Sequence, residues 1–143
     1  MSLSSWGENG WLKPHVTSDQ EISQLMRIVD REINDSSVTQ ISNDARLGML
    51  YNAGLKLAGI ALRSAGYRVA PGGMHHYRTI MSLPLTMGSG FENSADYLDT
   101  TRQLRNRADY ESVGFATDEH LVELRDVVKE LRAAVASTFH LEA

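Results

Sequence analysis

The 143-residue sequence contains no cysteine, which excludes disulfide bonds, thiolate metal sites and a cysteine nucleophile. It has no run of about 18 consecutive apolar residues, so no association with a membrane is expected. Acidic residues outnumber basic ones by 18 to 14, and the net charge of −4 argues against broad, non-specific nucleic-acid binding. The net charge does not exclude a local basic site. The N-terminus lacks a charged segment followed by an apolar stretch, so we expect a cytoplasmic protein without a signal peptide.

Motifs of several enzyme classes are also absent. The sequence has no nucleophile elbow, no zinc-protease motif, no phosphate-binding P-loop, no dinucleotide fingerprint and no paired di-iron motif. His75 and His76 are neighbours in the sequence. Adjacent side chains point about 100° apart on a helix, so this pair does not easily share one metal ion. We therefore expect neither a metal nor a cofactor.

Hydrophobic periodicity predicts four substantial helices and a short one. The first helix begins at a Ser18–Glu21 capping box and ends at residues 34–37, and the second runs from a Ser42 cap to about Ala65. The short helix runs from His75 to a kink or end at Pro84. The fourth runs from an Asn93 or Ser94 cap to residues 112–114, and the last begins at Thr117. No stretch alternates with a period of two over the length of a strand. The pattern indicates an all-α, up-and-down antiparallel helical bundle.

The second helix is apolar around most of its circumference, which predicts a position at the centre of the bundle. Gly54, Ala58, Ala61 and Ala65 recur on one side of it, and side chains this small let another backbone approach closely. In the last helix, a seam of apolar residues repeats at alternating spacings of three and four and predicts packing along another helix. Its members are Leu121, Leu124, Val128, Leu131 and Val135.

Residues 1–16 are rich in serine and glycine and are interpreted as an N-terminal arm, and residues 17–143 as one helical domain. The arm carries Trp6 and Trp11, which we expect to pack either on the domain or on a second subunit. Residues 66–73 contain Pro71-Gly72-Gly73 and are expected to form a loop.

The segment with the clearest candidate chemistry is Tyr97–Tyr110. On a helix, Leu98, Arg102, Arg105 and Asp109 form one lengthwise stripe, and Arg105 lies at the border of the apolar face. A partly desolvated guanidinium needs a partner, and the nearest candidate is the carboxylate of Asp109, four residues further on.

This cluster has two interpretations. In the first, Arg105 and Asp109 form a structural ion pair that orients the helix in the bundle. In the second, Arg102 and Arg105 bind an anion or phosphate, Asn106 orients the ligand and Asp109 holds Arg105 in place. Asn106 and Tyr110 flank the pair with further hydrogen-bonding groups. Catalysis would use Arg105, Asp109 and Tyr110, the pair His75 and His76, or both groups together.

Several segments resemble the small stand-alone bacterial HEPN-domain proteins, over about residues 21–135. The most specific are Tyr51-Asn52-Ala53, Gly66-Tyr67-Arg68, His75-His76 and the segment RNRADY from Arg105 to Tyr110. The resemblance implies an antiparallel helical bundle, often a homodimer. It also implies binding of nucleotides or RNA, or a nucleotidyltransferase-like or antitoxin partner in a toxin–antitoxin or defence system.

Nuclease members of that family carry an Arg-x4–6-His motif, and this chain departs from it. Tyr110 stands where the histidine would follow Arg105, and a phenol with an ordinary pKa near 10 is a poor base at neutral pH. Three hypotheses follow: a HEPN-like domain that binds phosphate or a partner without the usual nuclease motif, a metal-independent ribonuclease that takes its histidine from His75 or His76, and a structural or interaction protein.

Overall fold

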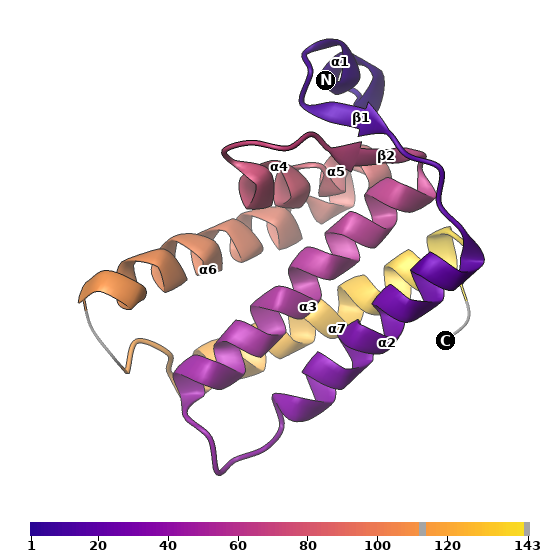
Figure 1. Cartoon of the computed structure of the whole chain (residues 1–143). Helices are drawn as coiled ribbons and strands as arrows, with labels where there is room; N and C mark the ends of the chain where they lie inside the picture. The colour runs from indigo at the N-terminus through magenta and orange to yellow at the C-terminus, as the bar shows by residue number, and fades with distance from the viewer. Residues whose placement is uncertain (112–113, 142–143) are drawn as a thin grey trace.

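The computed structural model describes residues 1–111 and 114–141, and the side chains of residues 1–107 and 114–141. Helices dominate these residues, which confirms the all-α helical bundle (Figure 1). In chain order the elements are α1 (Leu3–Glu8), β1 (Leu12–Pro14), α2 (Asp19–Asp35), α3 (Asn43–Ser64), β2 (Tyr67–Val69), α4 (His75–Met81), α5 (Leu83–Met87), a 3-10 turn (Ser89–Phe91), α6 (Glu92–Glu111) and α7 (Asp118–Thr138).

The four long helices, α2, α3, α6 and α7, alternate in direction along the chain (Figure 1). Helix α3 packs against both α2 and α7, as expected for the central helix of the bundle. Helices α3 and α7 begin at the same end, where the Asn43 side chain donates to Asp118 Oδ1 at 2.9 Å. Helix α2 runs antiparallel to α7 and is linked to it by Arg132, whose Nε lies 2.6 Å from Asp30 Oδ1. Helices α4 and α5 cover the end of the bundle where α6 begins.

The predicted apolar faces form the core. All five residues of the predicted seam in α7 are buried, as are Ile22, Met26 and Val29 of α2. Gly54 of α3 faces a side chain of α6, since a Cβ atom there would be 2.6 Å from Leu98 Cδ2. The small residue at position 54 therefore admits the Leu98 side chain of α6, while α2 and α7 pack more extensively against α3.

Residues 1–16 contain a helix, α1, and a strand, β1, neither of which the sequence predicted. Strand β1 pairs antiparallel with β2, with Leu12 opposite Val69, so part of the expected 66–73 loop is a strand. Three-residue strands are too short to show an alternating pattern, which is why the sequence did not reveal them. Trp6 is 7% exposed and packs with Leu12, Leu62 and Val69, so it contacts the chain's own helical domain.

Several predicted helix ends are confirmed. The hydroxyls of Ser18, Ser42 and Thr117 accept from backbone N–H groups of the first turns of α2, α3 and α7. A break at Ser82 separates α4 from α5, whose first turn contains Pro84. Within the part of the chain that the structure describes, no helix has both the length and the apolar character needed to cross a membrane.

Two expectations about helix starts are wrong. Glu21 does not close the capping box with Ser18, because its carboxylate binds the side chains of Thr17 and His15 instead. Asn93 and Ser94 do not cap α6, which begins at Glu92 directly after the 3-10 turn. Because that turn already bends the chain into helical geometry, both residues lie inside the helix.

Candidate functional site

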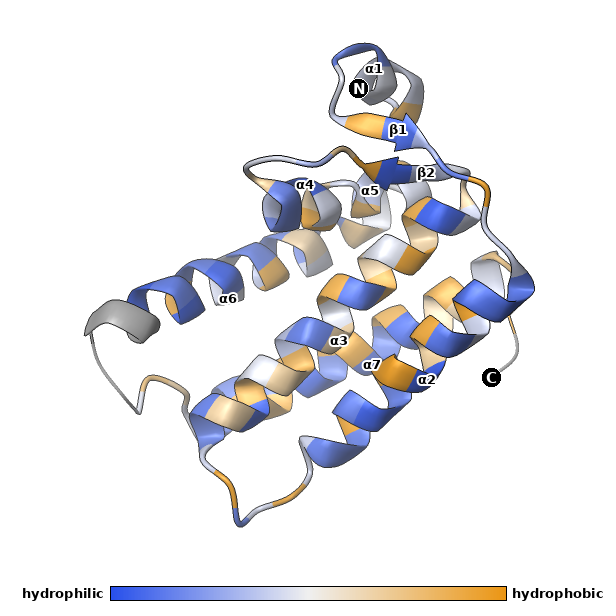
Figure 2. Ribbon diagram, viewed as in Figure 1, coloured by the Kyte–Doolittle hydropathy of each residue, from blue (hydrophilic) through white to orange (hydrophobic). Residues whose placement is uncertain are grey.

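The short helix α4 packs against both α3 and α6 (Figure 1), which brings the adjacent histidines toward the arginines of α6. Figure 2 shows α6 as hydrophilic along most of its length, with its few apolar residues on the side that meets the bundle. Ala95 and Leu98 are buried there, and Thr101 is nearly so at 6% exposure. One face of α6 is thus anchored in the core, and the residues next to that face can present polar groups to solvent.

Arg105 is half-buried, and its guanidinium carbon lies 5.0 Å from the centroid of the Tyr51 ring. Gly48 of α3 borders this side chain, and a Cβ atom there would lie 3.7 Å from Arg105 Nε, an ordinary van der Waals distance. The border position predicted for Arg105 is therefore present. The side chains of Asp109 and Tyr110, which the sequence nominated beside it, lie outside the described residues.

Tyr51 connects Arg105 to α4. Its side chain is fully buried, and its hydroxyl lies 3.3 Å from Nδ1 of His76. Burial raises the pKa of Tyr51 to about 12, although the positive charges of Arg105 and Arg102 act in the opposite direction. The phenol is therefore neutral near pH 7. Sequence reasoning placed Tyr51 only in the core, since no local pattern indicated that its hydroxyl would reach another helix.

His76 is in its neutral form near pH 7. Burial of the ring, followed by the nearby charges of His75, Arg105, Arg102 and Lys56, lowers its pKa from the ordinary value of 6.5. Two tautomers fit the contact with the tyrosine hydroxyl. Either the hydroxyl donates to a bare Nδ1, or Nδ1–H donates to the hydroxyl oxygen and leaves Nε2 free to accept a proton.

His75 occupies a different position. Its ring centroid lies 6.2 Å from that of His76, in an edge-on arrangement. Both histidines are exposed as whole residues, although the His76 ring is partly covered, and the hydrogen bond to Tyr51 is made by His76. The structure thus distinguishes the two histidines that the sequence left as equal candidates.

Arg102 already has a carboxylate partner. Its Nε lies 2.8 Å from Asp99 Oδ1, and its guanidinium carbon lies 5.6 Å from the Tyr77 ring. An arginine paired in this way has part of its charge neutralised and is less available to a ligand than the sequence suggested. The spacing of three residues between Asp99 and Arg102 was a usable signal for this pair. Asn106 is exposed on the following turn.

The cluster can therefore act on an anion in two ways. The planar guanidinium of Arg105 rests on an aromatic face, which favours a fixed orientation in which its N–H groups engage two oxygens of a phosphate. The neutral imidazole of His76 can accept or relay a proton. Among the described residues, no three His, Asp or Glu side chains are grouped so as to hold a metal ion.

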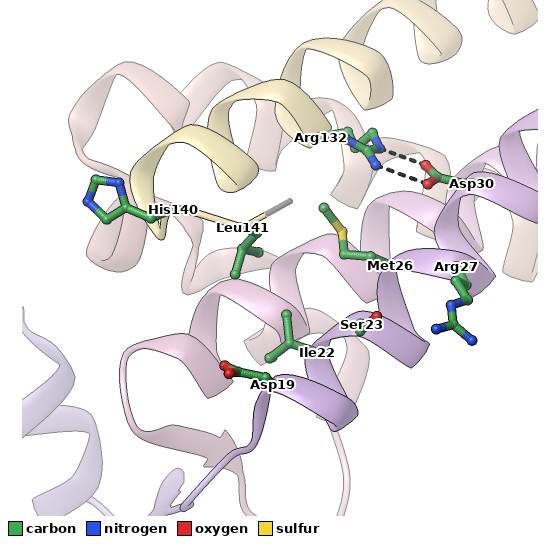
Figure 3. Close-up of a pocket in the computed structure, with 9 residues that line it drawn as sticks. All are labelled: Asp19, Ile22, Ser23, Met26, Arg27, Asp30, Arg132, His140 and Leu141. Carbon is green, nitrogen blue, oxygen red and sulfur yellow. Dashed lines mark hydrogen bonds and ion pairs between the residues drawn. The ribbon is translucent and has the colours of Figure 1, made fainter. Parts of the chain in front are cut away.

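A cavity of about 550 Å³ lies apart from this cluster, between α2 and the end of α7 (Figure 3). Ile22, Met26 and Leu141 point into it, and the Asp30–Arg132 ion pair closes one end. Figure 3 shows Arg27 and His140 pointing away from its centre. Because the rim carries both signs of charge, this cavity does not indicate one class of ligand.

Comparisons of the chain with models of protein families, with curated proteins and with solved structures gave no match. The resemblance to HEPN domains therefore rests on the residues quoted for it.

Proposed function

We propose that this chain binds a phosphate group of RNA or of a nucleotide on the surface where α4 meets α6, with Arg105 as the main contact. The observation that carries the proposal is a single chain of contacts, in which the Arg105 guanidinium lies on Tyr51 and the Tyr51 hydroxyl meets His76. This arrangement draws one residue from each of α3, α4 and α6 and leaves two polar groups at the surface of the bundle.

The physical reason lies in the geometry of arginine. A guanidinium is always charged, and its N–H groups form a planar fork that matches two phosphate oxygens. Packing against a buried ring restricts the motion of the fork, so less entropy is lost when a ligand binds. The chain has a net charge of −4, so such binding would depend on this local arrangement and not on a basic surface as a whole.

The biological setting that we propose follows from the resemblance to HEPN domains. It is a homodimeric domain in a toxin–antitoxin or defence system, with a nucleotidyltransferase-like or antitoxin protein as its partner. A short RNA or a nucleotide would then bind to Arg105 with or without cleavage.

Binding of fluorescein-labelled single-stranded RNA, measured by fluorescence anisotropy over a range of salt concentrations, tests the proposal. Arg105→Ala should weaken binding by about tenfold or more, since a hydrogen bond to a charged group contributes about 1.5–3 kcal/mol. Arg107→Ala removes the same charge from an exposed position on the same helix and should have a much smaller effect. Equal effects of the two substitutions would contradict a specific site, and no RNA binding by the wild-type chain would favour a structural or interaction protein.

A ribonuclease is the second candidate, and the contact between His76 and Tyr51 favours it. In the tautomer with Nδ1–H donated to the tyrosine oxygen, Nε2 can take the proton of an RNA 2′-hydroxyl. The 2′-oxygen would then attack the adjacent phosphorus, and the bond to the 5′-oxygen would break. The 5′-oxygen would take a proton from water, His76 would return its proton to solvent, and Arg105 would stabilise the charge that develops on the phosphate. The products would be a 2′,3′-cyclic phosphate and a 5′-hydroxyl.

A cleavage assay in the presence of EDTA separates the two candidates. If the ribonuclease mechanism holds, His76→Ala and Arg105→Ala should each reduce the cleavage rate by about 100-fold or more, and His75→Ala should reduce it far less. Cleavage that persists in the His76 or Arg105 variant would remove the mechanism. RNA binding without turnover would leave the binding function alone.

A further inference from the structure

A second group of positive charges lines a cavity of about 230 Å³ between α3, β2 and α4, which we name the basic pocket. Its polar lining comes from Lys56 and Arg63 of α3, Arg68 of β2, and His75 and His76 of α4. Thr79, Gly59 and leucine and valine side chains form the rest of its wall. His76 thus borders this cavity on one side and contacts Tyr51 on the other.

The charges of the basic pocket are only partly balanced. Of the described residues that line it, none is a carboxylate. Lys56 Nζ lies 3.1 Å from Glu32 Oε1, which is a normal ion pair. Arg63 Nε lies 3.9 Å from Glu21 Oε2, too far for a hydrogen bond, and this buried nitrogen has no hydrogen-bond partner among the described residues. A buried donor without an acceptor is unfavourable unless something else supplies one.

Arg68 adds an independent observation. Among the described side chains, no carboxylate forms an ion pair with its guanidinium. In the two-stranded sheet it lies directly opposite Lys13, so two like charges share one face of the ladder. Like charges directly opposite one another destabilise a sheet. An anion bound to Arg68 in the basic pocket would reduce that repulsion.

We propose that the basic pocket binds a terminal phosphate, the dianion of a phosphomonoester, carried by a free mononucleotide or by the end of an RNA strand. A phosphomonoester has three acceptor oxygens and a charge of about −1.5 to −2 near pH 7. It can therefore bind cationic side chains from both α3 and β2 at once. The cavity is smaller than the range of about 300–1,000 Å³ common for larger ligands, so it suits a phosphate with part of the attached sugar. This site is separate from Arg105 and does not depend on the function proposed above.

The competing explanation is structural: the aliphatic stems of Lys56 and Arg63 cover apolar residues while their charged ends reach water. Isothermal titration calorimetry with AMP, and with adenosine as the uncharged comparison, distinguishes the two. AMP should bind and adenosine should bind at least about tenfold more weakly. Arg68→Gln and Arg63→Gln should each weaken AMP binding by about tenfold. Lys129→Gln, a matched loss of charge at an exposed position of α7, should change it by less than about twofold.

A second experiment identifies the molecule that carries the phosphate. It compares the binding of two RNA oligonucleotides of the same sequence, one with a 5′-phosphate and one with a 5′-hydroxyl. If the RNA end is the source, the 5′-phosphate should strengthen binding in the wild type and not in Arg68→Gln. If a mononucleotide is the source, the two RNAs should bind alike while AMP binding still depends on Arg68. Both results support the proposal.

Three results would overturn the proposal. The first is no detectable binding of AMP at concentrations up to about 10 mM. The others are equal binding of adenosine and AMP, and AMP binding that is unchanged in Arg68→Gln and in Arg63→Gln when the circular dichroism of both variants matches the wild type. The binding of RNA and of AMP by Arg105→Ala distinguishes failure of this proposal from failure of the first one. That variant should bind RNA about tenfold or more weakly and retain AMP binding. Loss of AMP binding only in Arg105→Ala would instead assign the nucleotide to Arg105 and rule out the basic pocket.

Discussion

The contact between Gly54 of α3 and the Leu98 side chain of α6 gives a stability prediction opposite to the one from helix propensity. Gly54→Ala replaces a poor helix former with the best one, which alone would stabilise α3 by about 1 kcal/mol. The new Cβ atom, however, would lie 2.6 Å from Leu98 Cδ2, 3.4 Å from Leu98 Cδ1 and 3.5 Å from Val128 Cγ2. Leu98 is fully buried, so its side chain cannot turn toward solvent, and the contact must be relieved by a shift of packed groups.

The expected magnitude follows from two opposing contributions. Overpacking of a well-filled core costs about 1–3 kcal/mol, and the regained helix propensity offsets about 1 kcal/mol of it. A net loss of about 1 kcal/mol in the free energy of unfolding is therefore expected. For a chain of this size, that corresponds to a fall of about 3–4 °C in Tm.

The matched control is Gly48→Ala, on the same helix. Its Cβ atom would lie 3.7 Å from Arg105 Nε, an ordinary van der Waals distance, so this variant should gain up to about 1 kcal/mol. Urea unfolding followed by circular dichroism measures both variants against the wild type. If Gly54→Ala were as stable as Gly48→Ala, the tight packing of α3 on α6 would be refuted, and with it the basis for holding Arg105 over Tyr51.

The remaining predictions concern charge, loop anchoring and the N-terminal segment. The pKa of His76, measured by NMR titration of the ring, should lie below 6.5 and should rise in Arg105→Ala, because burial and then neighbouring positive charges disfavour protonation; an unchanged pKa in that variant would contradict the proximity of the two groups. Since the folded chain binds fewer protons at His76 than the unfolded chain does, the contribution of this residue to stability should decrease as pH falls from 6.5 toward its lower folded pKa. Asp44→Ala should lower the free energy of unfolding, measured in urea, by about 1–3 kcal/mol. The reason is that both carboxylate oxygens of Asp44 accept hydrogen bonds from backbone N–H groups of the segment that precedes α7, at 2.7 and 3.1 Å. Asp126→Ala, at an exposed position, should lower it by less than about 0.5 kcal/mol. Trp6→Ala should lower the free energy of unfolding by about 3 kcal/mol, and a change below about 1 kcal/mol would show that the N-terminal segment contributes little to the folded domain.

The sequence by itself determined the four long helices and most of their ends, but not helix α1 in the N-terminal segment. Apolar residues recur in α2 and α7 at the period of a helix, and caps at Ser18, Ser42 and Thr117 act within one turn, so both signals are local. The central position of α3 also followed from the sequence, because a helix that is apolar nearly all round must be covered on several sides. The half-buried position of Arg105 followed from its place at the edge of an apolar stripe.

Only the tertiary structure decided which side chains meet. The contacts of Tyr51 with Arg105 and His76 join residues from three helices, and the pairing of β1 with β2 joins segments more than fifty residues apart. No local pattern encodes such distances, because they depend on how α4 folds back over α3 and α6. The preference for His76 over His75, the partner of Arg102 and the gathering of cations in the basic pocket were decided in the same way, by the packing of helices that are distant in the chain.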